Sequence, residues 1–188
     1  MVTESYPNEG GRGPGTWDFF LEGEPAVRSY FMYKDDVECL KKFKANGYRF
    51  SIAWPRLLPN GTLSGGVNQA GIDFYNNLIN ELVANGIKPY VTLFHFDLPV
   101  ALQTAYNGML NSSFVKDYTA YADLCFKTFG DRVQHWITLN EPEVFAAYGY
   151  MMNLSISVDA ATFPYIVAHH LILAHASAVK VYRETYQV

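Results

Sequence analysis

The hydrophobic positions of this chain alternate between helical spacing and short continuous runs. Helical spacing recurs over residues 34–44, 71–84, 114–129 and 163–186. Continuous apolar runs of strand length occupy residues 48–54, 88–94 and 133–139. The pattern predicts helix-then-strand units in succession, followed by a last helix.

Each predicted helix carries one apolar face, and the first three stop at a glycine. Asn46-Gly47, Asn85-Gly86 and Gly130 are the expected helix ends. The positions expected to be buried are Val37, Leu40 and Phe43 in the first helix, Ile72, Tyr75, Ile79, Leu82 and Val83 in the second, Val115, Tyr118, Ala122, Cys125 and Phe126 in the third, and Ile166, Val167, His170, Leu171, Ala174 and Val181 in the last.

The predicted strands end at Trp54, His95 and Glu141, roughly 40–50 residues apart. That spacing predicts parallel strands joined by right-handed helical crossovers. A doubly wound sheet and a (β/α)8 TIM barrel both fit. The barrel is favoured because no glycine-rich phosphate loop follows any strand, and because each strand delivers large polar side chains. No linker interrupts residues 1–188, so a single α/β barrel domain is expected.

A polar pair ends the third apolar run. Residues 136–142 read Trp-Ile-Thr-Leu-Asn-Glu-Pro, so Asn140 and Glu141 follow the run directly. Such runs are usually buried on both faces, and ligands bind where parallel strands open into loops. Partial shelter by apolar neighbours favours the protonated form of a carboxyl. Glu141 is therefore expected to be half-sheltered and to act as a general acid, with a helix-capping or loop glutamate as the alternative.

Three other polar residues lie on or just after the predicted strands. Asn140 and His95 offer hydrogen-bond donors and acceptors, which suits a ligand rich in hydroxyls; a core histidine is the alternative for His95. Glu141 would protonate a leaving oxygen and later deprotonate water. Arg49 interrupts an apolar strand, where burial would require a carboxylate partner, so either a structural ion pair or a place near the site is open.

Metal and cofactor chemistry is not expected. His169, His170 and His175 share one predicted helix without the spacing and carboxylate of a zinc helix, so packing or surface positions are predicted for them. No serine or cysteine lies on a recognisable nucleophile elbow. Cys39 and Cys125 fall within helical patterns and are interpreted as small buried hydrophobes rather than a disulfide.

Composition narrows the class of partner. The 188 residues are 49% hydrophobic, 17% charged and 16% aromatic, with a formal net charge of −4, which is typical of a globular protein and does not favour nucleic acid or a membrane surface. Residues 1–15 show no charged-then-apolar signal pattern. N-glycosylation triplets at Asn60, Asn111 and Asn153 nevertheless permit a secretory route, so localisation is left open.

Several segments together resemble the plant β-glucosidase type of glycoside hydrolase family 1. They match in order and spacing over nearly the whole chain. The matching segments are residues 11–18 (Gly-Arg-Gly-Pro-Gly-Thr-Trp-Asp), 33–37, 48–54, 68–77, 92–99 (Thr-Leu-Phe-His-Phe-Asp-Leu-Pro), 129–132 and 136–142.

The resemblance implies a barrel that hydrolyses β-glycosides with retention of configuration. In that family pattern Glu141 is the acid/base, while Asn140 and His95 hold hydroxyls of the sugar. Arg49 is implied to orient the nucleophile. A retaining enzyme uses a pair of carboxyl groups about 5 Å apart, and the residues of this chain offer a candidate for only one of them.

The chain also departs from the family pattern. The nucleophile motif Glu-Asn-Gly does not occur in it, and the first barrel strand with its sugar-binding glutamine is not matched. Phe96 replaces the usual tryptophan, Glu143 replaces an aromatic residue, and Phe31 or Met32 replaces a histidine. The segments at residues 18–33 and after Tyr150 are shortened. These differences predict the N-terminal half of such a protein, roughly strands two to four of eight.

Two other hypotheses follow from these departures. The chain could be a sugar-binding or regulatory remnant without catalysis. It could also be a fragment that pairs with itself or with a complementary half through open sheet edges. In either case the 188 residues alone are expected to show little or no glycosidase turnover.

Overall fold

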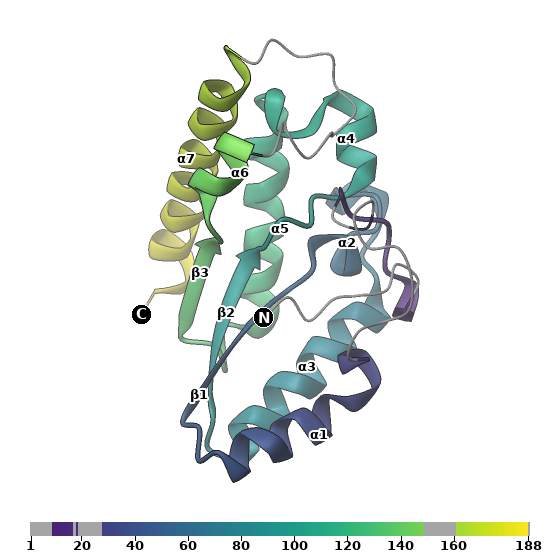
Figure 1. Ribbon diagram of the computed structural model, residues 1–188, viewed down its shortest axis with the longest axis vertical. Coiled ribbons are helices and arrows are strands. Elements are labelled where there is room, and N and C mark those ends of the chain that lie inside the picture. Colours follow the sequence, from purple (N-terminus) through teal and green to yellow (C-terminus); the bar gives the residue numbers. More distant parts are fainter. Residues whose placement is uncertain (1–8, 17, 19–27, 149–160, 188) are drawn as a thin grey trace.

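Three parallel strands lie at the centre of the chain (Figure 1). The structure, a computed structural model, describes residues 9–16, 18, 28–148 and 161–187. In the sheet order β1-β2-β3, the middle strand pairs with both neighbours. The strands are β1 (Gly47–Ser51), β2 (Lys88–Phe94) and β3 (His135–Leu139). The parallel pairing confirms the arrangement that the spacing of the apolar runs predicts.

Helices connect the strands and extend beyond them. The long helices are α1 (Ser29–Lys42), α3 (Gln69–Ala84), α5 (Ser113–Phe129) and α7 (Phe163–Val181). The shorter elements are η1 (Glu9–Gly11), α2 (Trp54–Leu57), η3 (Leu63–Gly65), α4 (Val100–Tyr106), η4 (Gly108–Leu110), α6 (Pro142–Tyr148) and η5 (Tyr182–Tyr186).

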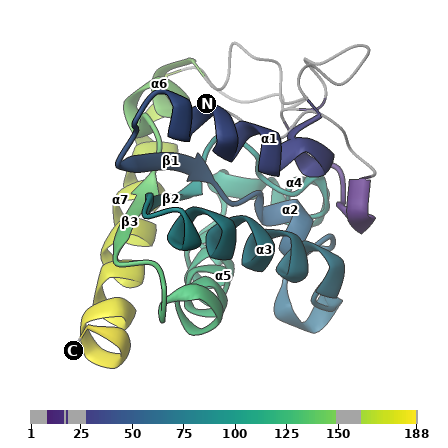
Figure 2. The same ribbon diagram turned by 90° about the horizontal axis from the view of Figure 1, so that it is seen from below.

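Both crossover helices cover the same face of the sheet. Figure 2 shows α3 and α5 side by side on one side of the strands. Tyr75 of α3 stacks on Phe50 of β1, with ring centroids 6.4 Å apart. Phe126 of α5 meets Trp136 of β3 edge-on at 5.0 Å. A doubly wound sheet would place helices on both faces, so this one-sided cover favours the barrel.

The strand register defines two adjacent rows of side chains. The "helix-covered row" consists of Phe50, Val91 and Trp136, and the "open row" of Arg49, Tyr90 and His135. Since successive side chains point to opposite faces of a strand, the two rows face opposite sides of the sheet. Phe50 and Val91 are buried, whereas Arg49 and His135 are exposed and Tyr90 is 37% exposed.

Two glycines end helices for different physical reasons. Gly86, after α3, has a φ of 72°, the left-handed conformation that commonly ends a helix. Gly130, after α5, is right-handed, but a side chain there would meet the carbonyl oxygen of Phe126 at 2.4 Å. The predicted ends at Gly86 and Gly130 are therefore confirmed, the first by conformation and the second by a close approach. α1 instead ends at Lys42, before the predicted stop at Asn46-Gly47, and Gly47 begins β1.

The first predicted strand is too long at its C-terminal end. β1 ends at Ser51, and Trp54 begins the short helix α2 instead of ending the strand. Pro55 stands near the start of α2, where its missing N–H costs nothing, so the chain turns into a helix there. The first helix begins earlier than predicted, at Ser29, and the third strand begins at His135 rather than at residue 133.

Some residues expected in the core are exposed instead. Phe43 is 83%, Val83 46% and Ile166 37% exposed, because each lies at the margin of its helix face or beyond the helix end. Cys39 is also exposed, two residues from the buried Val37 and so on the opposite side of α1. Cys125 is buried as expected, and both cysteines are free.

Some sequence features fall outside the described residues. The glycosylation triplet at Asn153 and the loop after Tyr150 are among them, whereas Asn60 and Asn111 are exposed. Among the helices that the structure describes, none combines the length and the apolar character needed to cross a membrane.

Candidate active site

His95 and Asn140 lie next to each other at the ends of paired strands. The last register pair of β2 and β3 joins Phe94 to Leu139, so the next residue of each strand is His95 or Asn140. The backbone N–H of Asn140 donates to the carbonyl oxygen of Phe94 at 2.9 Å. This bond continues the ladder past the end of β3 and fixes the backbone where both candidate side chains emerge.

Arg49 links these strand ends through hydrogen bonds. Its Nε donates to Thr92 Oγ1 at 3.0 Å, and its Nη2 donates to Asn140 Oδ1 at 2.6 Å. The residue is exposed, and within the described part of the chain neither partner is a carboxylate. Among the described residues, Arg49 therefore does not form the structural ion pair that was its alternative. An exposed guanidinium keeps part of its hydration, so it needs no buried counter-charge.

The half-buried His95 is held in its neutral form. Burial is the main cause that lowers the pKa of its imidazole, and the nearby Arg49 guanidinium adds to the effect, bringing the value from 6.5 to about 4. The neutral ring carries one donor and one acceptor nitrogen at physiological pH. Such a group can contact a hydroxyl in either direction.

Glu141 sits in a left-handed turn between β3 and α6. Its φ is 43°, a conformation that is uncommon outside glycine and that tends to occur at functional sites. The expectation that its side chain is half-sheltered is wrong for the described residues, because the side chain is exposed. The chain leaves the sheet after the buried Asn140, and the following residues Pro142 and Glu143 are exposed as well.

The loop that carries His95 is braced by the N-terminal segment. Thr16 donates from its hydroxyl to the carbonyl oxygen of Phe96 at 3.1 Å, and from its backbone N–H to the carbonyl oxygen of Leu98 at 2.8 Å. The segment itself is closed by a bidentate pair of Arg12 with Asp18, at 2.7 and 3.1 Å. Phe96 also has a positive φ, of 70°, so its loop depends on this support.

Tyrosine hydroxyls of α3 and α5 form hydrogen bonds with the backbone just after β1 and near the end of β2. The hydroxyl of Tyr121 on α5 lies 2.9 Å from the carbonyl oxygen of Ile52 and 2.8 Å from that of Leu93. Tyr75 on α3 accepts a hydrogen bond from the backbone N–H of Ala53 at 2.8 Å. These bonds satisfy buried backbone groups where β1 and β2 end.

The sequence pattern does not single out Thr92 or Tyr121. Both lie in segments that look like ordinary core, and only the partner of each hydroxyl distinguishes them. An aromatic residue or a threonine in an apolar run gives no signal of its hydrogen bond, because the bond crosses from one element to another.

The other three predicted histidines lie at packing or surface positions, as predicted: His170 is partly buried, whereas His169 and His175 are exposed. His170 Nδ1 lies 2.7 Å from the carbonyl oxygen of Met109, and His175 Nδ1 lies 2.8 Å from Thr138 Oγ1. Within the described ranges, no group of three or more histidine, cysteine or acidic side chains is arranged to hold a metal ion.

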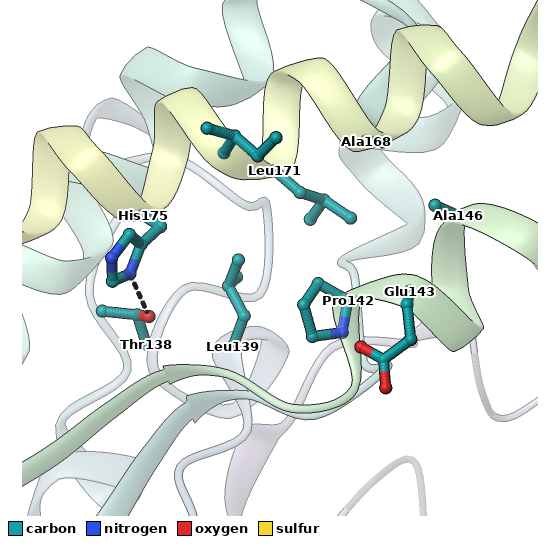
Figure 3. A pocket seen from close by; sticks show the side chains of 9 residues that line it. Thr138, Leu139, Pro142, Glu143, Ala146, Ala168, Leu171 and His175 are labelled. Carbon is teal, nitrogen blue, oxygen red and sulfur yellow. Dashed lines mark hydrogen bonds between the residues drawn. The ribbon is translucent and has the colours of Figure 1, made fainter.

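An apolar groove of about 510 Å³ lies beside β3, between α6 and α7. Figure 3 shows Leu139 and Leu171 lining it, with Glu143 toward one end and the His175–Thr138 hydrogen bond at the other. None of the four residues predicted for the site lines this groove. The groove therefore lies apart from His95, Asn140, Arg49 and Glu141, which we call the cluster at the strand ends.

The cluster at the strand ends can bind and can transfer a proton. A neutral imidazole and a carboxamide adjoin a fixed cation, and a carboxyl group follows the carboxamide in the chain. This set can hold hydroxyl groups and move a proton at a nearby oxygen. The structure thus brings His95, Asn140 and Arg49 together, and chain connectivity adds Glu141.

Comparison with known proteins gives a consistent result. The family model of glycosyl hydrolase family 1 matches residues 3–188. Beta-glucosidase 16 of Arabidopsis thaliana is 50% identical over 208 residues, covering 98% of this chain and 40% of that relative. The non-cyanogenic beta-glucosidase of Trifolium repens is 51% identical over 206 residues, covering 98% of this chain and 42% of that relative.

Solved structures agree with the sequence relatives. A rice β-glucosidase matches with a TM-score of 0.90 and 45% identity, over 97% of this chain and 43% of that one. A family 1 β-glucosidase from Thermotoga maritima matches with a TM-score of 0.87 and 40% identity, over 97% of this chain and 43% of that one. The chain thus spans about 40% of the length of the curated relatives named above.

These matches decide between the two folds that the strand spacing allowed. The parallel strands and their helices form part of a (β/α)8 TIM barrel, and the doubly wound sheet is excluded. The carboxyl ends of barrel strands carry the active sites of such enzymes, which is where the cluster lies. The chain belongs to glycosyl hydrolase family 1.

Proposed function

We propose that the protein hydrolyses β-glucosides with retention of configuration, and that this chain supplies its acid/base half. Glu141 protonates the leaving oxygen and then deprotonates the attacking water. His95 and Asn140 hold hydroxyls of the sugar, and Arg49 positions groups around them. The substrate is a small glycoside, and no cofactor takes part.

The hydrogen-bonded bridge from Arg49 to Asn140 carries this proposal. It joins the guanidinium of β1 to the carboxamide directly before Glu141, beside the neutral imidazole that follows β2. A sugar presents several hydroxyls close together, and such a set of donors and acceptors matches them. A loop glutamate with no function would not require this arrangement beside it.

Relatives support glucose as the sugar and retention as the outcome. The curated relatives named above carry β-glucosidase in their names. A mutant of the rice enzyme, 44% identical with a TM-score of 0.89, has been solved in a covalent complex with Glc. A covalent sugar–enzyme species is the intermediate of a retaining reaction.

The test is Glu141→Gln in the intact protein that the gene encodes. Loss of the proton donor is expected to lower kcat/KM on a glucoside with a poor leaving group by about 10²–10⁴-fold. An aryl glucoside with a good leaving group needs less protonation and should lose less in its first step. Added azide should restore turnover of the aryl glucoside by Glu141→Gln, because azide attacks the covalent intermediate without a general base.

Glu143→Gln is the matched control. Glu143 is an exposed carboxylate two residues away, in α6, and outside the proposed site. Its replacement should leave kcat/KM within about twofold of the unmodified value, as is usual for surface positions. Equal losses in both variants, or unchanged hydrolysis in Glu141→Gln, would refute the role of Glu141.

A second function applies to the 188-residue chain by itself, namely sugar binding without turnover. It is favoured by the sequence, because the chain contains no Glu-Asn-Gly segment to supply a nucleophile, and retention needs two carboxyl groups. Calorimetric titration of the chain with glucose should show binding, while an aryl β-glucoside assay should show no hydrolysis. Glu141-dependent hydrolysis by the chain alone would contradict this proposal.

A further inference from the structure

Thr92 is a buried partner of Arg49. It lies on the middle strand β2 and is 0% exposed. Its Oγ1 accepts the hydrogen bond from Arg49 Nε at 3.0 Å. A β-branched side chain has few rotamers, and burial removes the remaining freedom. The acceptor for Arg49 is therefore fixed in position.

Arg49 connects the buried Thr92 to Asn140, the residue after β3. It is exposed, so packing alone does not hold its guanidinium. The planar group is anchored at Nε by Thr92 and reaches Asn140 Oδ1 with Nη2 at 2.6 Å. A hydrogen-bonded path thus runs across all three strands of the sheet, from β1 to β2 and to the residue after β3.

The path determines which end of the Asn140 carboxamide remains available. A guanidinium only donates hydrogen bonds, so it must face the oxygen of the carboxamide and not its nitrogen. The Nδ2 group, with its two donors, is then directed elsewhere. Without a fixed Arg49, the carboxamide could turn over and offer an acceptor instead.

We infer that Thr92 is a positioning residue, which holds Arg49 so that Asn140 presents its N–H donors to a sugar hydroxyl. This inference rests on the proposed function for the identity of the ligand. Thr92 itself touches no substrate. Its effect on the reaction passes through Arg49 and Asn140.

Two conservative variants separate positioning from packing. Thr92→Val keeps the shape and removes the hydroxyl, whereas Thr92→Ser keeps the hydroxyl and removes a buried methyl group. Packing predicts that the serine variant is the more damaged, because it leaves a cavity. Positioning predicts the reverse for function, with serine active and valine impaired.

The first measurement is the NMR signal of Arg49 Nε–H in the protein, assigned through Arg49→Lys. A slowly exchanging signal is expected in the unmodified protein and in Thr92→Ser, and its loss in Thr92→Val. The second measurement is kcat/KM for an aryl β-glucoside in the intact protein. We expect a loss of about tenfold in Thr92→Val, the size of one charged hydrogen bond, and less than about threefold in Thr92→Ser.

The inference is overturned if Thr92→Val keeps the Arg49 signal, if it keeps kcat/KM within about twofold of the unmodified value, or if Thr92→Ser loses as much activity as Thr92→Val. Failure of the proposed function looks different. In that case the unmodified protein hydrolyses no β-glucoside or Glu141→Gln changes nothing, while the Arg49 signal still reports whether Thr92 holds the guanidinium.

Discussion

The helix-covered row and the open row lie one residue apart on the same three strands, yet their surroundings differ. On the helix-covered row, Phe50 is 1% and Val91 0% exposed, beneath α3 and α5. On the open row, Arg49 and His135 are exposed among the described residues. The helix-covered row therefore contributes burial to stability, whereas the open row contributes Arg49 to the candidate site.

The contrast between the two rows shows that membership of a strand does not by itself tell whether a residue is buried. Strands of a parallel sheet are usually covered on both faces and so read as continuous apolar runs. β3 reads in that way, but its residues are exposed or only partly buried. The expectation that this apolar run is buried on both faces is wrong for the described residues, since the described helices cover one face alone.

Replacing Phe50 with alanine should have the largest effect on stability. The ring is buried against Tyr75, so its loss leaves a cavity and should lower the free energy of unfolding by about 3–5 kcal/mol. Urea denaturation of the chain, followed by circular dichroism, measures the change. A loss below about 0.5 kcal/mol, the usual range of surface changes, would erase the distinction between the rows.

The next largest effect on stability is expected at His95, which directly follows β2. Folding lowers the pKa of its imidazole from 6.5 to about 4, so between these values the unfolded chain binds the proton more tightly. The resulting contribution to stability is complete above about pH 6.5 and is lost as the pH falls towards 4. We expect it to be smaller than the effect at Phe50, because the half-buried ring is partly screened by water.

Two measurements check this pH dependence. The NMR shift of the His95 ring gives its pKa directly, and urea titrations from pH 4 to 7 give the slope of stability, which His95→Gln should reduce. Arg49→Gln should raise the pKa of His95, since it removes the neighbouring positive charge. A pKa near 6.5 in the unmodified chain would contradict the described environment.

A smaller effect is expected on the open row, at Tyr90. Its ring stacks on His135 with centroids 4.5 Å apart but is 37% exposed, so Tyr90→Ala should cost about 0.5–1.5 kcal/mol. Tyr165→Ala, at a 77% exposed position on α7, should change stability by less than about 0.5 kcal/mol. The same urea titrations compare the two variants.

A loss at Tyr90 as large as that at Phe50 would mean that another surface covers the open row in solution. Among the described residues β1 and β3 each pair with one strand only, which leaves an edge on either side. Self-association through such edges remains a prediction. Analytical ultracentrifugation of the chain would then separate a dimer from a monomer.

Much of the fold follows from the sequence, because it depends on local pattern. The helical period of α5 and the apolar run of β2 are confirmed nearly to the residue. The pattern misplaces Trp54 at the end of a strand, because the buried helical turn that Trp54 begins looks like the continuation of a buried strand. The prediction that Cys39 is buried is also wrong, since a place within a helix does not say which side of the helix a residue faces.

The sequence by itself determined the order of the elements, their parallel pairing and the strand ends that carry His95, Asn140 and Glu141. These properties depend on periodicity and on turn residues close together in the chain. Only the tertiary structure decided that Arg49 bonds to Thr92 and Asn140, that His95 is neutral and that Glu141 is exposed. Hydrogen bonds and burial of this kind join residues from separate strands, so they depend on register and packing that no single segment contains.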